Sequence, residues 1–103
     1  MREIYVTELD EYILSGATLI DVREPGEFAE GHVPGARNVP MAQLSGGLGD
    51  VDRDRPVLLI CWSGNRSGAM CDVVRAAGFD TLNVGGGTAA WIRAGGPVEA
   101  GVR

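Results

Sequence analysis

Short apolar runs recur along the chain and are separated by segments with helix-like spacing of polar and apolar residues. Three of these runs, at residues 18–22, 57–61 and 81–84, are rich in Val, Ile and Leu. Runs of this length and composition are typical of strands buried on both faces of a parallel sheet. Two weaker runs, at residues 4–6 and 36–39, are expected to form edge strands.

The segments between the runs carry helix signals. The clearest helix is predicted at residues 67–77, with Ser67 as its N-cap and Gly78 as its C-terminal stop. Its apolar stripe consists of Ala69, Met70, Val73, Val74 and Ala77. Shorter helices are expected at residues 8–15, with Thr7 as N-cap, and at 24–30, 41–44 and 88–94. Alternating strands and helices predict one small α/β domain over residues 1–103, with a mainly parallel sheet.

Charge and composition narrow the function classes. The net charge of −5 disfavours nucleic acid and anionic membrane as partners. Charged residues at Arg2 and Glu3 argue against a signal peptide, and no apolar run approaches the roughly 20 residues of a membrane span. Two cysteines without a framework spacing favour a reducing, cytoplasmic setting. The single histidine, His32, has no metal-ligand partners nearby in sequence, so neither a metal nor another cofactor is expected.

The segment with the strongest chemical signal is CWSGNRS at residues 61–67, which lies between a predicted strand and a predicted helix. In open α/β sheets, sites lie at the carboxyl ends of strands. A loop that enters a helix there directs several backbone N–H groups, and the positive end of the helix dipole, at one point. Gly64 lets the backbone turn inward, and Arg66 adds a permanent cation.

A thiol in such a loop is expected to have a lowered pKa, and the thiolate is the nucleophilic form. Cys61 could then accept sulfur as an anionic persulfide and pass it to a second nucleophile. The simpler interpretation is a buried structural cysteine at a strand end. The glycine and arginine at fixed offsets, followed by a helix, favour the nucleophile.

These residues resemble a known family. CWSGNRS resembles the active-site loop of rhodanese domains, in which a cysteine, four intervening residues and an arginine surround the sulfur site. DVREPGEFAEGHVPGARNVP at residues 21–40 and NVGGGTAAW at residues 83–91 resemble the family's two other signatures. The likeness extends from about Tyr5 to Glu99. It implies a small rhodanese-like three-layer α/β domain, with a five-stranded, mainly parallel sheet flanked by helices.

The resemblance also implies residue roles. Cys61 would form the persulfide, and Arg66 would be its catalytic partner. Substrate sulfur would be bound by the loop residues Trp62, Ser63, Gly64, Asn65 and Ser67. The polar signature residues Asp21, Arg23 and Glu27 are expected to organise the loop electrostatically, with one carboxylate fixing the Arg66 guanidinium.

The implied activity is that of a thiosulfate:cyanide-type sulfurtransferase. Sulfane sulfur would pass from thiosulfate or a persulfide, through Cys61, to a thiophilic acceptor, and a protein could serve as donor or acceptor. Many family members carry Arg or another polar residue where this chain has Trp62. An indole attracts a small dianion less than a cation does, which favours an organic or protein persulfide donor, unless Trp62 simply packs against neighbouring loops.

Other functions stay open at this point. A sulfur-relay protein, or a regulatory binding module with little thiosulfate activity, would have the same fold. A cysteine phosphatase ranks lower, because such enzymes place five residues between Cys and Arg and usually a His before the Cys. Here four residues intervene, and Ile60 precedes Cys61.

Several nearby residues are expected to be structural. Cys71 lies about 7 Å further along the predicted helix than Arg66, so it is expected to pack and not to pair with Cys61. His32 is expected to be a locally hydrogen-bonded turn residue, not a catalytic base. The glycines at residues 85–87 are expected to let the backbone pass close to the loop at residues 61–67, here called the sulfur loop, and Trp91 is expected in the core.

Overall fold

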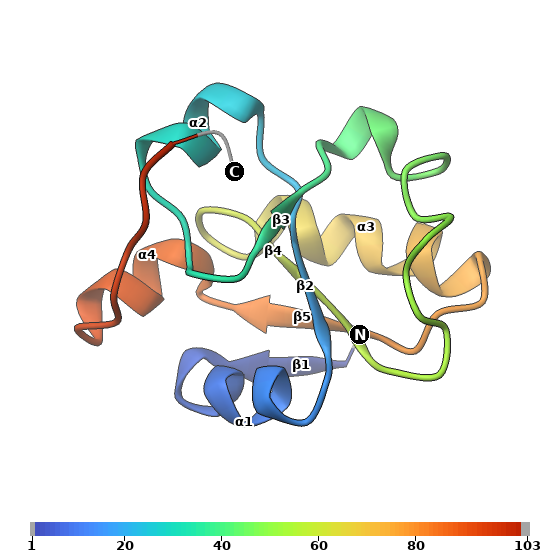
Figure 1. Ribbon diagram of the computed structural model, residues 1–103, viewed down its shortest axis with the longest axis horizontal. Coiled ribbons are helices and arrows are strands. Elements are labelled where there is room, and N and C mark those ends of the chain that lie inside the picture. Colours follow the sequence, from blue (N-terminus) through green and yellow to red (C-terminus); the bar gives the residue numbers. More distant parts are fainter. Residues whose placement is uncertain (1, 102–103) are drawn as a thin grey trace.

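Five strands form the central sheet in the order β1-β5-β4-β2-β3 (Figure 1). The structure is a computed structural model that describes residues 2–101. The strands are β1 (Glu3–Tyr5), β2 (Thr18–Asp21), β3 (Arg37–Asn38), β4 (Val57–Ile60) and β5 (Thr81–Gly85). Every neighbouring pair is parallel. The predicted runs therefore all form strands, and the expected five-stranded parallel sheet is confirmed.

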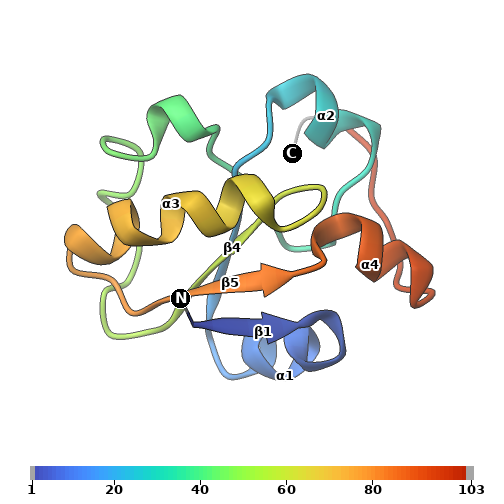
Figure 2. The same cartoon turned by 180° about the vertical axis from the view of Figure 1, so that it is seen from behind.

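Helices cover both faces of this sheet. They are α1 (Leu9–Leu14), α2 (Pro25–Glu30), α3 (Asn65–Ala76) and α4 (Gly87–Arg93). There are also two 3-10 turns. Val6–Glu8 precedes α1, and Met41–Gln43 follows β3. Figure 2 shows α3 in front of the sheet, with α1 behind it. The arrangement is the three-layer α/β domain that the sequence predicts.

The core has two halves because alternate residues of a strand face opposite sides of the sheet. In the central strand β4, Val57 and Leu59 pack toward α3, whereas Leu58 and Ile60 pack toward the helices on the other face. All four side chains are fully buried, as expected for a strand covered on both faces. Cys61 continues the alternation on the α3 side, so the end of β4 aims its thiol at the first turn of α3.

Three local predictions are wrong. The first helix is not capped by Thr7, because a 3-10 turn occupies Val6–Glu8 and α1 begins at Leu9. The third helix begins two residues earlier than predicted, at Asn65, so Ser67 lies inside its first turn and is not its N-cap. The stripe predicted for α3 is wrong in part. Val74 is buried and Met70 packs against the core, as predicted, but Ala69, Val73 and Ala77 are exposed. Ser67 and Cys71 complete the buried face.

Residues 2–101 contain neither a membrane-spanning helix nor a cluster of metal ligands. No helix in that range is long and apolar enough to cross a membrane. Within the same range, no group of three or more His, Cys, Asp or Glu side chains is arranged to hold a metal ion.

Candidate active site

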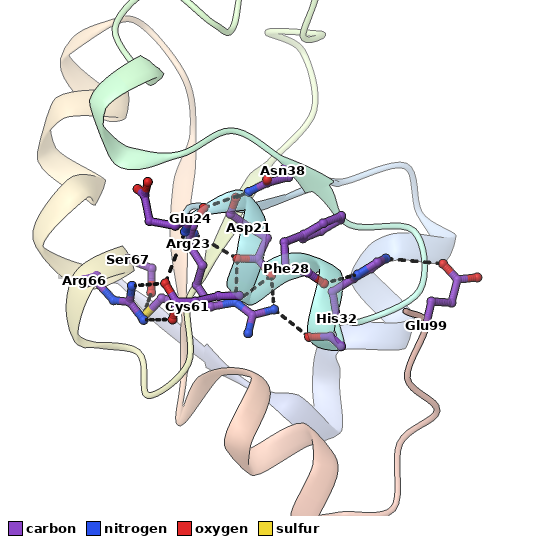
Figure 3. A network of polar contacts seen from close by, with 12 residues as sticks. Asp21, Arg23, Glu24, Phe28, His32, Asn38, Cys61, Arg66, Ser67 and Glu99 are labelled. Carbon is purple, nitrogen blue, oxygen red and sulfur yellow. Dashed lines mark hydrogen bonds and ion pairs between the residues drawn. The ribbon is translucent and has the colours of Figure 1, made fainter. Parts of the chain in front are cut away.

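The Cys61 thiol lies at the carboxyl end of β4, in front of the first turn of α3 (Figure 3). Its Sγ accepts a hydrogen bond from the Gly64 N–H, with the two heavy atoms 3.1 Å apart. The Ser67 Oγ lies 3.4 Å from the same sulfur. Gly64 has a φ of 96°, a left-handed conformation that favours glycine, and this turn folds the loop back over the sulfur. Cys61 is completely buried, but its sulfur faces polar donors.

Two opposing effects set the pKa of the Cys61 thiol. Burial raises the pKa, because it disfavours the charged thiolate. Hydrogen bonds from the Ser67 hydroxyl and from the backbone N–H groups of Ser67, Gly64 and Ser63 lower it, and together they outweigh burial. The net pKa is therefore below its ordinary value. The same donors would stabilise a persulfide anion at this position.

Asn83 of β5 connects the two groups that contact the sulfur. Its Oδ1 accepts a 2.6 Å hydrogen bond from the Ser67 hydroxyl, and its Nδ2 donates to the Gly64 carbonyl at 3.1 Å. Nδ2 also donates to the Glu3 carboxylate at 3.0 Å. Sequence reasoning did not select Asn83 as a site residue. The available signal was an amide side chain within the buried strand TLNVG, since a buried polar group requires partners.

Arg66 forms a two-point ion pair with Glu27 of α2. The guanidinium nitrogens lie 2.7 and 2.9 Å from the two carboxylate oxygens. This guanidinium holds the pKa of Glu27 at about 2, below its ordinary value of 4.5. The predicted pairing of Arg66 with a signature carboxylate is therefore present, and Glu27 provides the carboxylate. The pair fixes the sulfur loop to α2.

Asp21 and Arg23 form a second ion pair, buried beneath α2. The Asp21 side chain is 0% exposed and that of Arg23 is 4% exposed, with 2.9 Å between Oδ2 and Nη2. Arg23 also donates to the Gly31 carbonyl at 2.8 Å, at the end of α2. These two residues pair with each other and not with Arg66. Their contact with the sulfur loop is indirect, through the position of α2 and its Glu27.

The other predicted loop residues lie differently. The side chains of Trp62, Ser63 and Asn65 are exposed, and only the backbone of Ser63 contributes to the environment of the sulfur.

The glycines after β5 allow close contact between the backbone of α4 and that of the sulfur loop, as predicted. A Cβ on Gly87 would lie 2.4 Å from the Cys61 carbonyl oxygen. Two N–H groups at the start of α4 donate to the Cys61 and Trp62 carbonyls, at 2.9 Å each.

The residues predicted to be structural occupy buried positions. His32 stacks on Phe28, with ring centroids 3.6 Å apart, and its Nδ1 lies 2.8 Å from the Phe28 carbonyl. Cys71 is a buried free thiol whose Sγ donates to the Ser67 carbonyl at 3.5 Å, and burial raises its pKa. Trp91 is 6% exposed and donates its indole N–H to the Pro97 carbonyl.

Known proteins resemble this chain in sequence and fold. Residues 5–94 match the family described as "Rhodanese-like domain". A "Sulfurtransferase" of Allochromatium vinosum is 35% identical in an alignment that covers 92% of this chain and 96% of that protein. YqhL of Bacillus subtilis is 42% identical over 85 residues, covering 82% of this chain but 65% of YqhL. A rhodanese-related protein from Thermoplasma volcanium superimposes with a TM-score of 0.86 at 34% identity, over 96% of this chain and 98% of that one. With its three signatures and its parallel sheet, the chain belongs to the rhodanese-like domain family.

Proposed function

We propose that this chain is a sulfurtransferase that carries sulfane sulfur on Cys61. The observation that supports this most directly is the position of Sγ, 3.1 Å from the Gly64 N–H and in front of a helix N-terminus. A buried cysteine with only a packing role would not need backbone donors aimed at its sulfur. The similarity to a protein named sulfurtransferase adds independent support.

The proposed reaction has two steps. The Cys61 thiolate attacks the outer sulfur of thiosulfate or of a persulfide. The sulfur–sulfur bond of the donor breaks, and sulfite or a thiolate leaves with the electron pair. A thiophilic acceptor such as cyanide or a thiolate then attacks the outer sulfur of the Cys61 persulfide, and the Cys61 thiolate leaves. Each step exchanges one bond to the transferred sulfur for another, so no external oxidant or reductant is needed.

The roles proposed for the other residues follow from their contacts. Gly64, Ser67 and the Ser63 amide would stabilise the anionic sulfur, because they already lower the pKa of Cys61. Arg66 would add positive charge at the loop, while Glu27 fixes its guanidinium. Asp21 and Arg23 would act at a distance, by holding α2 in place. Trp62 and Asn65, whose side chains are exposed, would contact a substrate at the mouth of the site.

Two other functions are ranked lower. A cysteine phosphatase would have to seat a group with three equatorial oxygens, and a loop with four residues between Cys61 and Arg66 encloses less space than a loop with five. A sulfur-relay or regulatory module would use the same fold with a protein partner. The cytoplasmic location, and the absence of nucleic acid and membrane partners, stay predictions from composition.

Intact mass spectrometry tests the proposal. The protein is incubated with thiosulfate and, separately, with a cysteine desulfurase and cysteine. We expect a gain of one sulfur atom that cyanide removes, that is absent in Cys61→Ser and that is retained in the matched variant Cys71→Ser. Loading by the desulfurase alone would favour the relay. Loading by neither donor would refute sulfur transfer, and Cys61-dependent hydrolysis of an aryl phosphate would favour the phosphatase.

A further inference from the structure

A pocket of about 480 Å³ opens beside the sulfur loop. Three of its lining residues, Trp62, Ile92 and Val98, are large apolar side chains with exposed fractions of 47%, 43% and 44%. They come from three separate segments: the sulfur loop, α4 and the stretch after α4. Apolar side chains left half-exposed around one concavity of this size are typical of a binding site for a small molecule.

The pocket adjoins the loop that contains Cys61. Trp62 directly follows Cys61, so their Cα atoms are about 3.8 Å apart. Glu27, another lining residue, holds Arg66 at 2.7 Å. The hydrogen bonds from the start of α4 to the Cys61 and Trp62 carbonyls fix Ile92 relative to the sulfur loop. A molecule seated here would lie against Trp62, the residue that follows Cys61.

The charges of the lining residues discriminate between ligands. The Glu27 carboxylate is neutralised by Arg66, and the Arg23 guanidinium is neutralised by buried Asp21. The third charged lining residue, Glu30, is exposed and has no ion-pair partner within residues 2–101. Among the residues that the structure describes, the uncompensated charge of the pocket lining is therefore negative. Together with the exposed indole of Trp62, it attracts ammonium groups and repels carboxylates and small dianions.

We propose that this pocket binds the sulfur acceptor, a small organic thiol with an apolar body and a cationic or neutral end. The proposal rests on the function proposed above and names the substrate class for its second step. The thiolate of the acceptor attacks the outer sulfur of the Cys61 persulfide. The sulfur–sulfur bond breaks, Cys61 leaves as a thiolate, and the acceptor departs as a persulfide.

A matched set of thiols tests this proposal. The acceptors are three phenylmethanethiols that differ in their para group. The aminomethyl compound is cationic at neutral pH, the hydroxymethyl compound is neutral and the carboxymethyl compound is anionic. Mercaptoethanol, which has no apolar body, is the reference. Protein loaded with sulfur from polysulfide is mixed with each thiol, and the loss of one sulfur atom is followed by mass spectrometry. After correction for thiol pKa, we expect the cationic thiol to react about tenfold faster than the anionic one. We expect the neutral phenylmethanethiol to react about tenfold faster than mercaptoethanol, and this ratio is the aryl advantage.

Single substitutions separate the two contributions. Glu30→Gln should bring the ratio of the rates of the cationic and anionic thiols close to one and should leave the aryl advantage unchanged. Its control is Glu11→Gln, which removes an exposed carboxylate outside the pocket and should change neither ratio. Ile92→Ser should remove most of the aryl advantage. Its matched control is Val73→Ser on α3, because Val73 is also 43% exposed but does not line the pocket.

Binding can be measured without any reaction. The S-methyl derivatives of the same thiols should quench the fluorescence of Trp62, identified by comparison with Trp62→Phe, in the same order of charge. If Cys61 takes up no sulfur, the proposed function is refuted. The binding measurement then shows by itself whether the pocket prefers cationic ligands with an apolar body. If sulfur transfers at rates that follow thiol pKa alone, with no charge preference in binding, the acceptor pocket is refuted and the proposed function stands. Dimerisation that Ile92→Ser abolishes would also refute it, because a second copy of the chain would then fill the pocket.

Discussion

Replacing Ser67 by alanine should raise the pKa of Cys61, because it removes a hydroxyl that favours the thiolate. The Ser67 hydroxyl has one hydrogen and two neighbours that can accept it, Asn83 Oδ1 at 2.6 Å and Cys61 Sγ at 3.4 Å. The orientation of the amide is fixed, because Asn83 Nδ2 faces two acceptors, the Gly64 carbonyl and the Glu3 carboxylate. Asn83 Oδ1 therefore takes the hydroxyl hydrogen while Cys61 is a neutral thiol, and a thiolate competes for it.

The size of the effect follows from this competition. A hydrogen bond to a charged group contributes about 1.5–3 kcal/mol, and the neutral bond to Asn83 that must be given up contributes about 0.5–1.5 kcal/mol. The hydroxyl thus favours the thiolate by about 1 kcal/mol. By the same reasoning, Asn83→Leu removes the competing acceptor and should lower the pKa of Cys61 by a similar amount.

The ultraviolet absorbance of the thiolate, measured against pH, gives the pKa directly. Subtracting the titration of Cys61→Ser removes the contribution of Cys71, which both proteins retain. At a pH below the pKa, sulfur loading of the Ser67→Ala protein should slow by up to about tenfold, in proportion to its smaller thiolate fraction. An unchanged or lowered pKa in Ser67→Ala would show that the hydroxyl does not stabilise the sulfur anion. Equal shifts of the same sign in Ser67→Ala and Asn83→Leu would refute the competition.

Three further predictions concern the loop and its supports. Above pH 4.5, Glu27→Gln should lower the free energy of unfolding by about 1 kcal/mol, a value that allows for the partial exposure of its pair with Arg66. The wild type should lose this contribution as the pH falls from 4.5 toward 2. Urea denaturation at a series of pH values measures both changes. Arg23→Met should cost about 3–5 kcal/mol in the same assay, because it leaves the Asp21 carboxylate buried and unpaired, and adding Asp21→Asn should restore most of the loss. Gly87→Ala should slow sulfur loading even where the protein folds, because its Cβ would push α4 away from the sulfur loop; loading at the wild-type rate would contradict that contact.

The sequence alone determined the layers of the fold and the position of Cys61 within it. Short runs of branched apolar residues can be stable only where both faces are covered, and this requirement predicts the parallel sheet. The end of such a strand, followed by a glycine and then a helix, places Cys61 at a helix N-terminus through local geometry alone. These features depend on neighbours in the chain, so periodicity and spacing are sufficient to find them.

Only the tertiary structure decided which side chains meet across elements. The sequence offered two carboxylates for Arg66, and the placement of α2 assigns Glu27 to it while Asp21 pairs with Arg23. Asn83 reaches the sulfur loop because β5 lies beside β4 with its amide on the α3 face. Contacts of this kind depend on the lateral order of strands and on the rotation of helices about their axes. Those are set by packing of the whole core, and a pattern along one chain does not encode them locally.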